Sequence, residues 1–286
     1  MEEIAPGVHV ETGYEGVNVA AVVTDRGLIC IDTPSHARDA RHWSAQLDRL
    51  HPRPPRFLVL TDFRPERSLN AGWLGAPIIA HQSAAERVAG QERRWQPSHF
   101  EPAAFRTPGD DKDVGGLLEM PAVCFSETVI LADGARQLEV RHMPGPTAAS
   151  CWAYLPAEGV LFAGDSVNWG TPLPLAEMCC GAWIESLQRL TAGEPDVQAL
   201  IPGRGAIASP EAAGPPLAFL EALRAAVQSH LAAALPRDQL GQLFAALAAE
   251  LRPAAETADW WQRQVRFGLE RAYDELALGE LQTAGL

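Results

Sequence analysis

Residues 58–70 have the sequence LVLTDFRPERSLN, in which a short apolar run passes directly into a charged turn. The run from Phe57 to Thr61 has the length and composition of a buried strand. The charged residues that follow it are Asp62, Arg64, Glu66 and Arg67. A strand that ends in this way places these ionisable side chains within one short turn.

Strands and helices alternate on both sides of this turn. Upstream, Val19–Val23 and Leu28–Asp32 are predicted to pair as a hairpin across Asp25-Arg26-Gly27, and a helix over about 40–50 follows. Downstream, we predict strands at 76–81, 128–132, 138–142, 151–155, 160–163 and 197–201, helices at 83–90 and around 183–190, and a loop over about 97–120. Two groups of strands with helices between them indicate a layered α/β domain that ends near residue 209.

The composition changes after residue 209, where the chain becomes rich in Ala and Leu without strand-like alternation. Three helices are predicted, at about 215–235, 237–252 and 257–279. On the last one, the residues that form one stripe are Trp261, Val265, Leu269, Tyr273 and Leu276. Such a stripe indicates a side that faces the core, or else a dimer or lid surface. We therefore divide the chain into an α/β domain, residues 1–209, and a helical extension, residues 210–286, that serves as a lid or in dimerisation.

The composition excludes several classes of protein. Lys plus Arg number 23 and Asp plus Glu 36, a net charge of −13 over 286 residues, so sequence-independent binding to nucleic acid is not expected. No run of 18 apolar residues predicts a membrane span, and the start MEEIAPG has no apolar segment of a secretory signal. Five cysteines, an odd and scattered number, indicate a reducing compartment. We expect a cytoplasmic protein with neither a nucleic-acid nor a membrane partner.

Five segments, taken in order, resemble one family. They are GLICIDTP (27–34), LVLTDFRPERSLN (58–70), MPGPTAAS (143–150), VLFAGDS (160–166) and LIPGRG (200–205). Together they resemble the metallo-β-lactamase superfamily of metal-dependent hydrolases, over roughly residues 6 to 210. The resemblance implies a four-layer αββα sandwich of the metallo-β-lactamase type, here with a C-terminal helical extension. It also implies a metal site at one edge, where the two sheets meet.

The resemblance does not extend to the metal ligands. In the family, the motif H-x-H-x-D-H follows a strand that ends in Thr, whereas the corresponding positions here hold Asp62, Arg64, Glu66 and Arg67. Pro146 and Arg204 stand where the family has two further His ligands, and the bridging Asp is retained as Asp165. Because arginine stays protonated and proline offers no lone pair, we expect this set to hold no dinuclear metal site and no other cofactor.

The resemblance implies that the seven replaced or retained positions converge as a pocket at the former metal site. Arg64, Arg67 and Arg204 oppose Asp62, Glu66 and Asp165, which gives a formal charge of zero from 3 − 3. Guanidinium groups are expected to neutralise the carboxylates in place of metal ions, with bidentate pairing favoured. The three carboxylates suit Mg²⁺ or Ca²⁺, but the arginines would repel either cation.

Three functions remain open from the sequence. The first is a non-catalytic binding protein, whose arginines hold a small anion unless internal salt bridges occupy them. The second is a metal-independent hydrolase of a small ester, lactone or other anionic substrate, with Glu66 or Asp165 as the catalytic base. The third is a partner protein that forms a homodimer or binds an active homologous copy. Loss of metal-dependent hydrolysis is common to all three.

Overall fold

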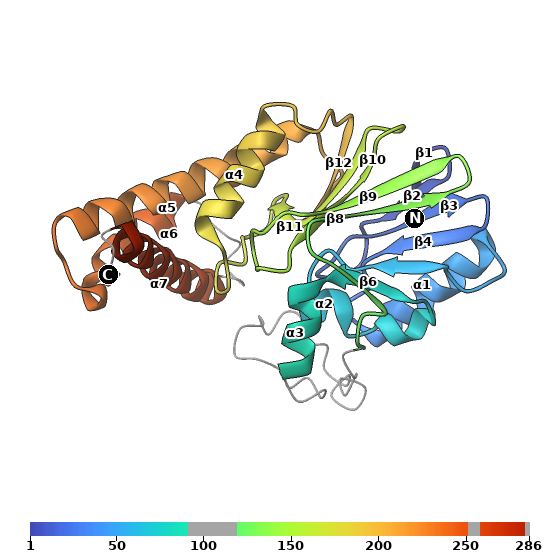
Figure 1. Cartoon of the computed structure of the whole chain (residues 1–286), viewed down its shortest axis with the longest axis horizontal. Helices are drawn as coiled ribbons and strands as arrows, with labels where there is room; N and C mark the ends of the chain where they lie inside the picture. Colours follow the sequence, from blue (N-terminus) through green and yellow to red (C-terminus); the bar gives the residue numbers. More distant parts are fainter. Residues whose placement is uncertain (91–118, 251–257, 284–286) are drawn as a thin grey trace.

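The first half of the chain forms a seven-stranded mixed sheet. The computed structural model describes residues 1–90, 119–250 and 258–283 (Figure 1). The strands lie in chain order across this sheet: β1 (Glu2–Ala5), β2 (Val8–Glu11), β3 (Val19–Thr24), β4 (Gly27–Ile31), β5 (Phe57–Val59), β6 (Ile78–His81) and β7 (Val123–Phe125). Neighbours from β1 to β4 are antiparallel, and neighbours from β4 to β7 are parallel.

The second sheet has five strands in the order β12-β11-β10-β9-β8. These are β8 (Thr128–Asp133), β9 (Arg136–His142), β10 (Cys151–Leu155), β11 (Val160–Asn168) and β12 (Ala199–Arg204). Only the pair β11 and β12 is parallel. All nine residues of β11 are buried, because this strand lies inside the sheet and is covered on both faces.

The two sheets pack face to face, with helices on both outer sides (Figure 1). Val59 and Ile79 of the first sheet meet Val140 and Ala153 of the second in one buried cluster. The first sheet is covered outside by α1 (Ala37–Leu50), the short α2 (Pro65–Ser68), the 3-10 turn Ala71–Leu74 and α3 (Gln82–Gly90). The second is covered by α4 (Cys180–Thr191). This is the αββα arrangement that the resemblance implies.

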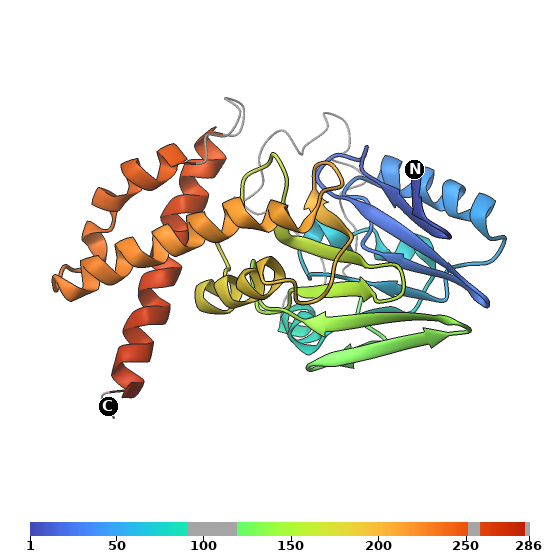
Figure 2. The same cartoon turned by 90° about the horizontal axis from the view of Figure 1, so that it is seen from above.

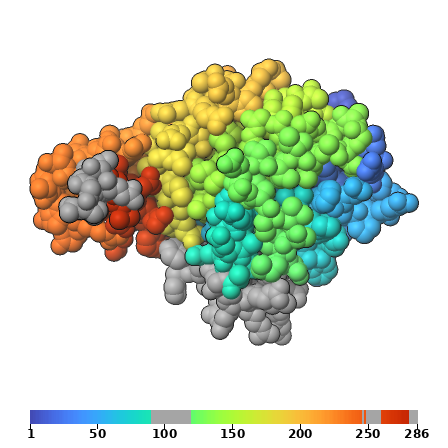
Figure 3. Space-filling view, in the orientation of Figure 1, coloured from blue at the N-terminus to red at the C-terminus, as the bar shows by residue number. Residues whose placement is uncertain are grey.

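The helical extension projects beyond one end of the sandwich (Figure 3). It comprises the 3-10 turn Pro210–Ala213, α5 (Gly214–Ala232), the 3-10 turn Arg237–Gln239, α6 (Gly241–Glu250) and α7 (Ala258–Thr283). Trp183 and Leu187 of α4 belong to the same buried cluster as Leu223 of α5 and Trp261 of α7. The stripe on the last helix therefore faces the core: Trp261, Val265 and Leu269 are buried in this cluster, and Tyr273 and Leu276 pack against it.

The predicted elements differ from the structure mainly at their ends. β11 continues to Asn168, beyond the predicted end at residue 163, and the predicted helix over 237–252 begins instead with a 3-10 turn before α6. β1, β2 and β7 lie outside the predicted strands, since each has only three or four residues, although β2 alternates between buried and half-buried side chains. The predicted loop over 97–120 lies outside the described residues, apart from its last two positions. The predicted domain boundary falls immediately before the turn Pro210–Ala213.

Candidate functional site

The charged turn after β5 is closed by its own backbone and by Ser68. Pro65 occupies the first position of α2, where its missing N–H costs no hydrogen bond. The hydroxyl of Ser68 donates to the carbonyl oxygens of Phe63 and Arg64, at 2.9 and 3.0 Å. This tight turn directs Arg67 into the protein, where its side chain is fully buried.

Arg67 joins two carboxylates that belong to different sheets. Its Nε and Nη2 donate to the two oxygens of Asp165 on β11, at 3.2 and 2.5 Å. Its Nη1 donates to Oδ2 of Asp32, immediately after β4, at 2.7 Å. Asp32 also accepts the backbone N–H and the hydroxyl of Thr61, at 2.8 and 2.6 Å. The guanidinium is thus held in a bidentate pair and a second ion pair.

Space for this arrangement depends on Gly203 of β12. A Cβ atom at that position would lie 2.6 Å from Oδ1 of Asp165 and would overlap the Arg67 guanidinium. Asp32 has a left-handed backbone, with φ of 57°, a conformation that aspartate tolerates better than most residues. Both observations show that the local backbone is fitted to the ion pairs.

Arg204 and Arg64 extend the network toward the surface. Arg204 donates to Glu66 at 2.9 Å and to Asp165 at 3.4 Å. Arg64 lies farther from its partners, with Nε 3.5 Å from Glu66 and Nη1 3.9 Å from Asp165. Asp165 therefore has all three arginines around it, and Glu66 has two of them.

Asp62 is held by hydroxyl groups rather than by a guanidinium. It accepts the hydroxyls of Ser150 at 2.6 Å and Thr147 at 2.9 Å, and the backbone N–H of Arg64 at 3.2 Å. Ser150 and Thr147 belong to the turn over 143–150, which also contains Pro146. Pro146 directly precedes Thr147 in this turn and is buried, and its ring has no polar group to contribute to the network.

The carboxyl groups of the network differ in their pKa values. Burial raises the pKa of Asp62 to about 6, against the smaller opposing effects of Arg64, Ser150 and Thr147. Burial alone would also raise the pKa of Asp165, but Arg67, Arg204 and Arg64 together hold it well below its usual range. Burial likewise opposes a low pKa at Glu66, yet Arg64 and Arg204 lower it. Burial raises the pKa of Asp32 in spite of Arg67.

The structure brings six of the seven proposed pocket residues into direct polar contact with one another or with shared partners. They are Asp62, Arg64, Glu66, Arg67, Asp165 and Arg204. Pro146 reaches them only through its turn. The sequence did not assign Asp32, Thr147 and Ser150 to this site. Asp32 changes the expected charge balance, because three arginines now face four carboxylates, and 3 − 4 gives −1 rather than zero.

The donor set does not fit the dinuclear metal centre that the resemblance implies. Both oxygens of Asp165, the retained family ligand, accept N–H groups of Arg67. Burial lowers the pKa of Arg67, but Asp165 and Asp32 outweigh it and raise that pKa above its ordinary value, so this side chain stays protonated. Among residues 1–90, 119–250 and 258–283, no three His, Cys, Asp or Glu side chains are grouped to hold a metal ion. The side chains at this position therefore form an ion-pair network and not a set of metal ligands.

The loop after β11 borders this network and is fixed by the last helix. Trp169 donates its backbone N–H to the carbonyl oxygen of Arg204 at 3.0 Å, and its side chain is exposed. Farther along the loop, Oε1 of the buried Gln264 accepts the N–H groups of Leu175 and Ala176, at 2.7 and 3.0 Å. Glu275 accepts the N–H groups of Cys180 and Gly181, both at 2.8 Å, at the start of α4. The helical extension thus determines the course of the loop.

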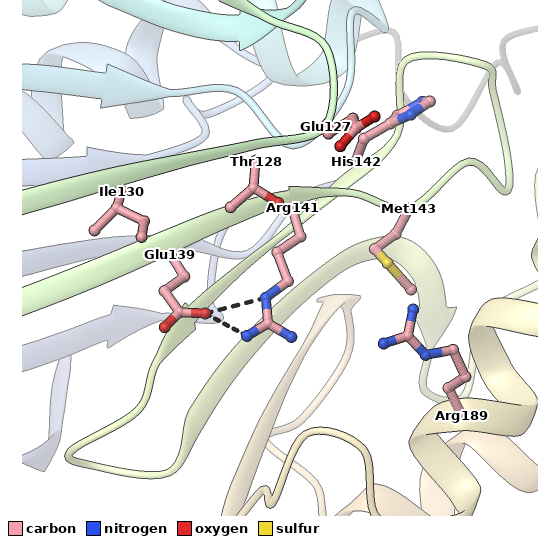
Figure 4. A pocket seen from close by; sticks show the side chains of 8 residues that line it. All are labelled: Glu127, Thr128, Ile130, Glu139, Arg141, His142, Met143 and Arg189. Carbon is pink, nitrogen blue, oxygen red and sulfur yellow. Dashed lines mark hydrogen bonds and ion pairs between the residues drawn. The ribbon is translucent and has the colours of Figure 1, made fainter.

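A separate shallow groove of about 460 Å³ lies on the outer face of β8 and β9 (Figure 4). It is lined by Glu127, Thr128, Ile130, Glu139, Arg141, His142, Met143 and Arg189. Arg141 is paired with Glu139 across two positions of β9, through two N–H groups. The groove is at the opposite border of the second sheet from β12. It is therefore distinct from the ion network.

Comparisons with solved structures identify the fold. A metallo-β-lactamase from Pontibacter korlensis aligns with a TM-score of 0.61 and 20% identity, over 77% of this chain and 97% of that one. The metallo-β-lactamase DIM-1 aligns with a TM-score of 0.60 and 19% identity, over 77% of this chain and 95% of that one. The inverting sec-alkylsulfatase Pisa1 from a Pseudomonas species aligns with a TM-score of 0.69 and 16% identity, over 95% of this chain and 49% of that chain. No protein-family model and no curated protein matches the sequence.

The chain therefore has the metallo-β-lactamase fold. The two lactamases align with 77% of it, whereas the alignment with the sulfatase reaches 95%. The chain spans about half the length of that sulfatase. No helix of the described residues combines the length and the apolar character that a membrane span requires.

Proposed function

We propose that this protein does not catalyse metal-dependent hydrolysis and acts as a non-catalytic binding or partner protein built on a hydrolase fold. The observation that carries the proposal is the Arg67 guanidinium, which is buried and hydrogen-bonded to both Asp165 and Asp32. A metal at Asp165 would have to displace this cation. Displacement would leave the buried Arg67 guanidinium without its carboxylate partners. Breaking a buried ion pair in this way costs about 3–5 kcal/mol of stability.

Of the two kinds of ligand expected from the sequence, a macromolecular partner is better supported than a small anion. Each of the three arginines faces at least one carboxylate. The set carries more acidic than basic groups, so an entering carboxylate or phosphate would meet net repulsion. A partner that binds the outer surface, such as an active homologous copy of the fold, does not require these arginines.

A metal-independent hydrolase is the alternative, and the pKa values do not favour it. Arg67, Arg204 and Arg64 outweigh burial and keep the pKa of Asp165 well below its usual range, and Arg64 and Arg204 lower that of Glu66. A carboxylate with a lowered pKa is a poor general base, because it gains little from taking up a proton. Neither catalytic candidate is therefore suited to activating water.

The decisive experiment measures bound metal. The protein is purified without chelator, incubated with zinc, manganese or iron, desalted and analysed by mass spectrometry for metal content. We expect far less than one bound metal ion per protein molecule. We also expect no turnover of lactam, lactone, thioester or phosphodiester substrates. A zinc metallo-β-lactamase carried through the same steps is the positive control. Zinc bound in stoichiometric amount by the wild type would overturn the proposal.

A variant with the family ligands restored shows whether the network alone prevents binding. It combines Asp62→His, Arg64→His, Glu66→Asp, Arg67→His, Pro146→His and Arg204→His. We expect it to bind zinc more tightly than the wild type, since it removes all three cations and supplies nitrogen ligands. Equal zinc affinity in the two proteins would contradict this account.

A further inference from the structure

The border strand of the second sheet, β8, has an open side. β8 pairs with β9 along its whole length, from Thr128 opposite Arg141 to Asp133 opposite Arg136. No described strand pairs with its other side. In the view of Figure 2, β8 forms the lower rim of the sandwich. An open strand edge presents backbone N–H and C=O groups that another strand can bind.

The register determines which backbone groups point outward. His142 donates its N–H to the carbonyl of Glu127 at 2.7 Å. In an antiparallel pair, residues that exchange such bonds alternate with residues that do not. Val129 and Leu131 therefore bond to β9, whereas Thr128, Ile130 and Ala132 direct their N–H and C=O groups away from it. These three residues provide a symmetric set of donors and acceptors centred on Ile130.

The side chains of β8 do not protect this edge. Ile130 is 54% exposed, and Thr128 and Ala132 are exposed beside it. The sequence TVILA over 128–132 contains no charged residue and no proline. Border strands usually carry a lysine, a proline or a bulge that discourages pairing. β8 instead combines high β-propensity with an apolar surface.

We propose that two copies of this chain pair through β8, antiparallel, about a two-fold axis at Ile130. Ile130 then lies opposite Ile130 of the second copy, and Thr128 lies opposite Ala132. Val129 meets Leu131 on the inner face. Every outward N–H and C=O group of the three central residues finds a partner, and no like charges oppose each other in this central segment. The two five-stranded sheets become one continuous sheet.

The charges at the ends of β8 are compatible with this register. Asp133 would lie opposite Glu127 of the second copy. Asp133 is already close to Arg26 and Arg56, at 3.4 and 3.3 Å, and Asp25 accepts the N–H of Ala135 in the same turn, so two cations balance two anions at this end. Glu127 of the second copy therefore meets a set of charges without a net negative excess. Since a single strand pair buries less area than a standard interface, we expect a weak dimer that depends on concentration.

The first test measures mass in solution. Sedimentation equilibrium on the full chain is expected to show a mass that rises from 30.8 kDa toward twice that value as concentration increases. Ile130→Lys places two cations face to face on the axis and is expected to return the mass to that of the monomer. Leu278→Lys, at a 60% exposed apolar position on α7, is the matched control and leaves the association unchanged. Circular dichroism confirms that both variants fold.

The second test reads the register by cross-linking. In a Cys124→Ser background, which removes an exposed native thiol, Ile130→Cys is expected to form an intermolecular disulfide on mild oxidation. Paired residues in this arrangement have Cα atoms about 5.5 Å apart, within disulfide range. Thr128→Cys should not cross-link, because its two copies lie about 14 Å apart. A monomer at all concentrations, or a dimer that Ile130→Lys leaves intact, would overturn the proposal. Neither outcome depends on the metal-free function.

Discussion

At the scale of single residues, Arg67 holds the two sheets together at the end where they meet. It binds Asp32 next to β4 of one sheet and Asp165 on β11 of the other. Burying three charged groups is costly, and the cost is offset only while all of them remain paired. The guanidinium is therefore a structural element of the sandwich as well as the centre of the candidate site.

Replacement of Arg67 is expected to destabilise the protein strongly. Arg67→Met keeps much of the volume but leaves Asp165 and Asp32 without their cation, which should cost about 3–5 kcal/mol. Urea unfolding followed by circular dichroism measures this loss. Arg237→Met is the control, because Arg237 pairs with Asp274 and Glu270 on the surface and is 46% exposed. Its loss should cost less than about 1 kcal/mol. Equal stabilities of the two variants would contradict the role given to Arg67.

Asp62 gives the site a pH dependence of its own. Because its pKa in the folded protein is raised from 3.8 to about 6, the folded state binds a proton more tightly than the unfolded state. The stability that Asp62 contributes is present below pH 3.8 and is lost as the pH rises through 6. The difference in unfolding free energy between wild type and Asp62→Asn should therefore fall by about 2–3 kcal/mol over this range.

The measurement is urea unfolding of both proteins at a series of pH values. Arg64 and Asp165, which both influence Asp62, are present in the two proteins, so the difference isolates the Asp62 titration. Asp48→Asn, on the exposed side of α1, controls for the substitution itself. A difference that grows with pH, or does not change, would show that Asp62 is not held in this way.

At the scale of elements, α7 fixes the loop beside the network. Gln264, Arg271 and Glu275 lie on one side of this helix and bind the backbone of residues 175–181. Gln264→Met would leave the N–H groups of Leu175 and Ala176 without an acceptor. We expect this to lower the free energy of unfolding by about 1–3 kcal/mol. Hydrogen exchange of this loop should become faster. Gln262→Met, exposed on the same helix, is expected to leave the exchange unchanged.

The elements also differ in how well the sequence predicts them. Strands with several apolar residues in a row, such as β5 and β10, are predictable because burial determines their composition. β1 and β7 are short and partly exposed, so pairing with their neighbours rather than their own pattern makes them strands.

The same contrast holds within the site. The family resemblance predicts that six residues of the site lie close together, because they occupy the metal-ligand positions of its motifs. These residues are Asp62, Arg64, Glu66, Arg67, Asp165 and Arg204. Asp32 lies in the segment 27–34, which also resembles the family, but its role depends on a left-handed backbone that only the structure reveals. Thr147 and Ser150 enter through hydrogen bonds that span 85 and 88 residues. No local pattern predicts contacts of that range.

At the scale of the whole molecule, the extension shares a core with the sandwich. Leu187 and Leu190 of α4 pack in the same cluster as Leu220 and Leu223 of α5. Deleting residues 214–286 would expose this face of α4, and each large apolar side chain buried there contributes about 1.5–3 kcal/mol. Several such losses exceed the total stability of an ordinary domain, about 5–15 kcal/mol.

We therefore expect the chain ending at residue 213 to lose its cooperative unfolding transition and to aggregate. Near-UV circular dichroism and light scattering measure both effects. Co-expression of residues 214–286 as a separate polypeptide should restore solubility, if the shared core is the cause. A truncated chain that unfolds cooperatively, with stability close to that of the full chain, would show that the sandwich is independent of the extension.

The hydrogen bonds from α7 have a consequence for synthesis. Leu175 and Gln264 are 89 residues apart, and Cys180 and Glu275 are 95 apart. A ribosome releases the chain from its N-terminus, so Asp32, Asp165 and Arg204 emerge before α7 does. During that interval the residues of the ion network have left the ribosome, but the side chains of α7 that accept the N–H groups of the loop have not. Translation that pauses before α7 would present this loop to proteases and chaperones, whereas the finished chain keeps it closed.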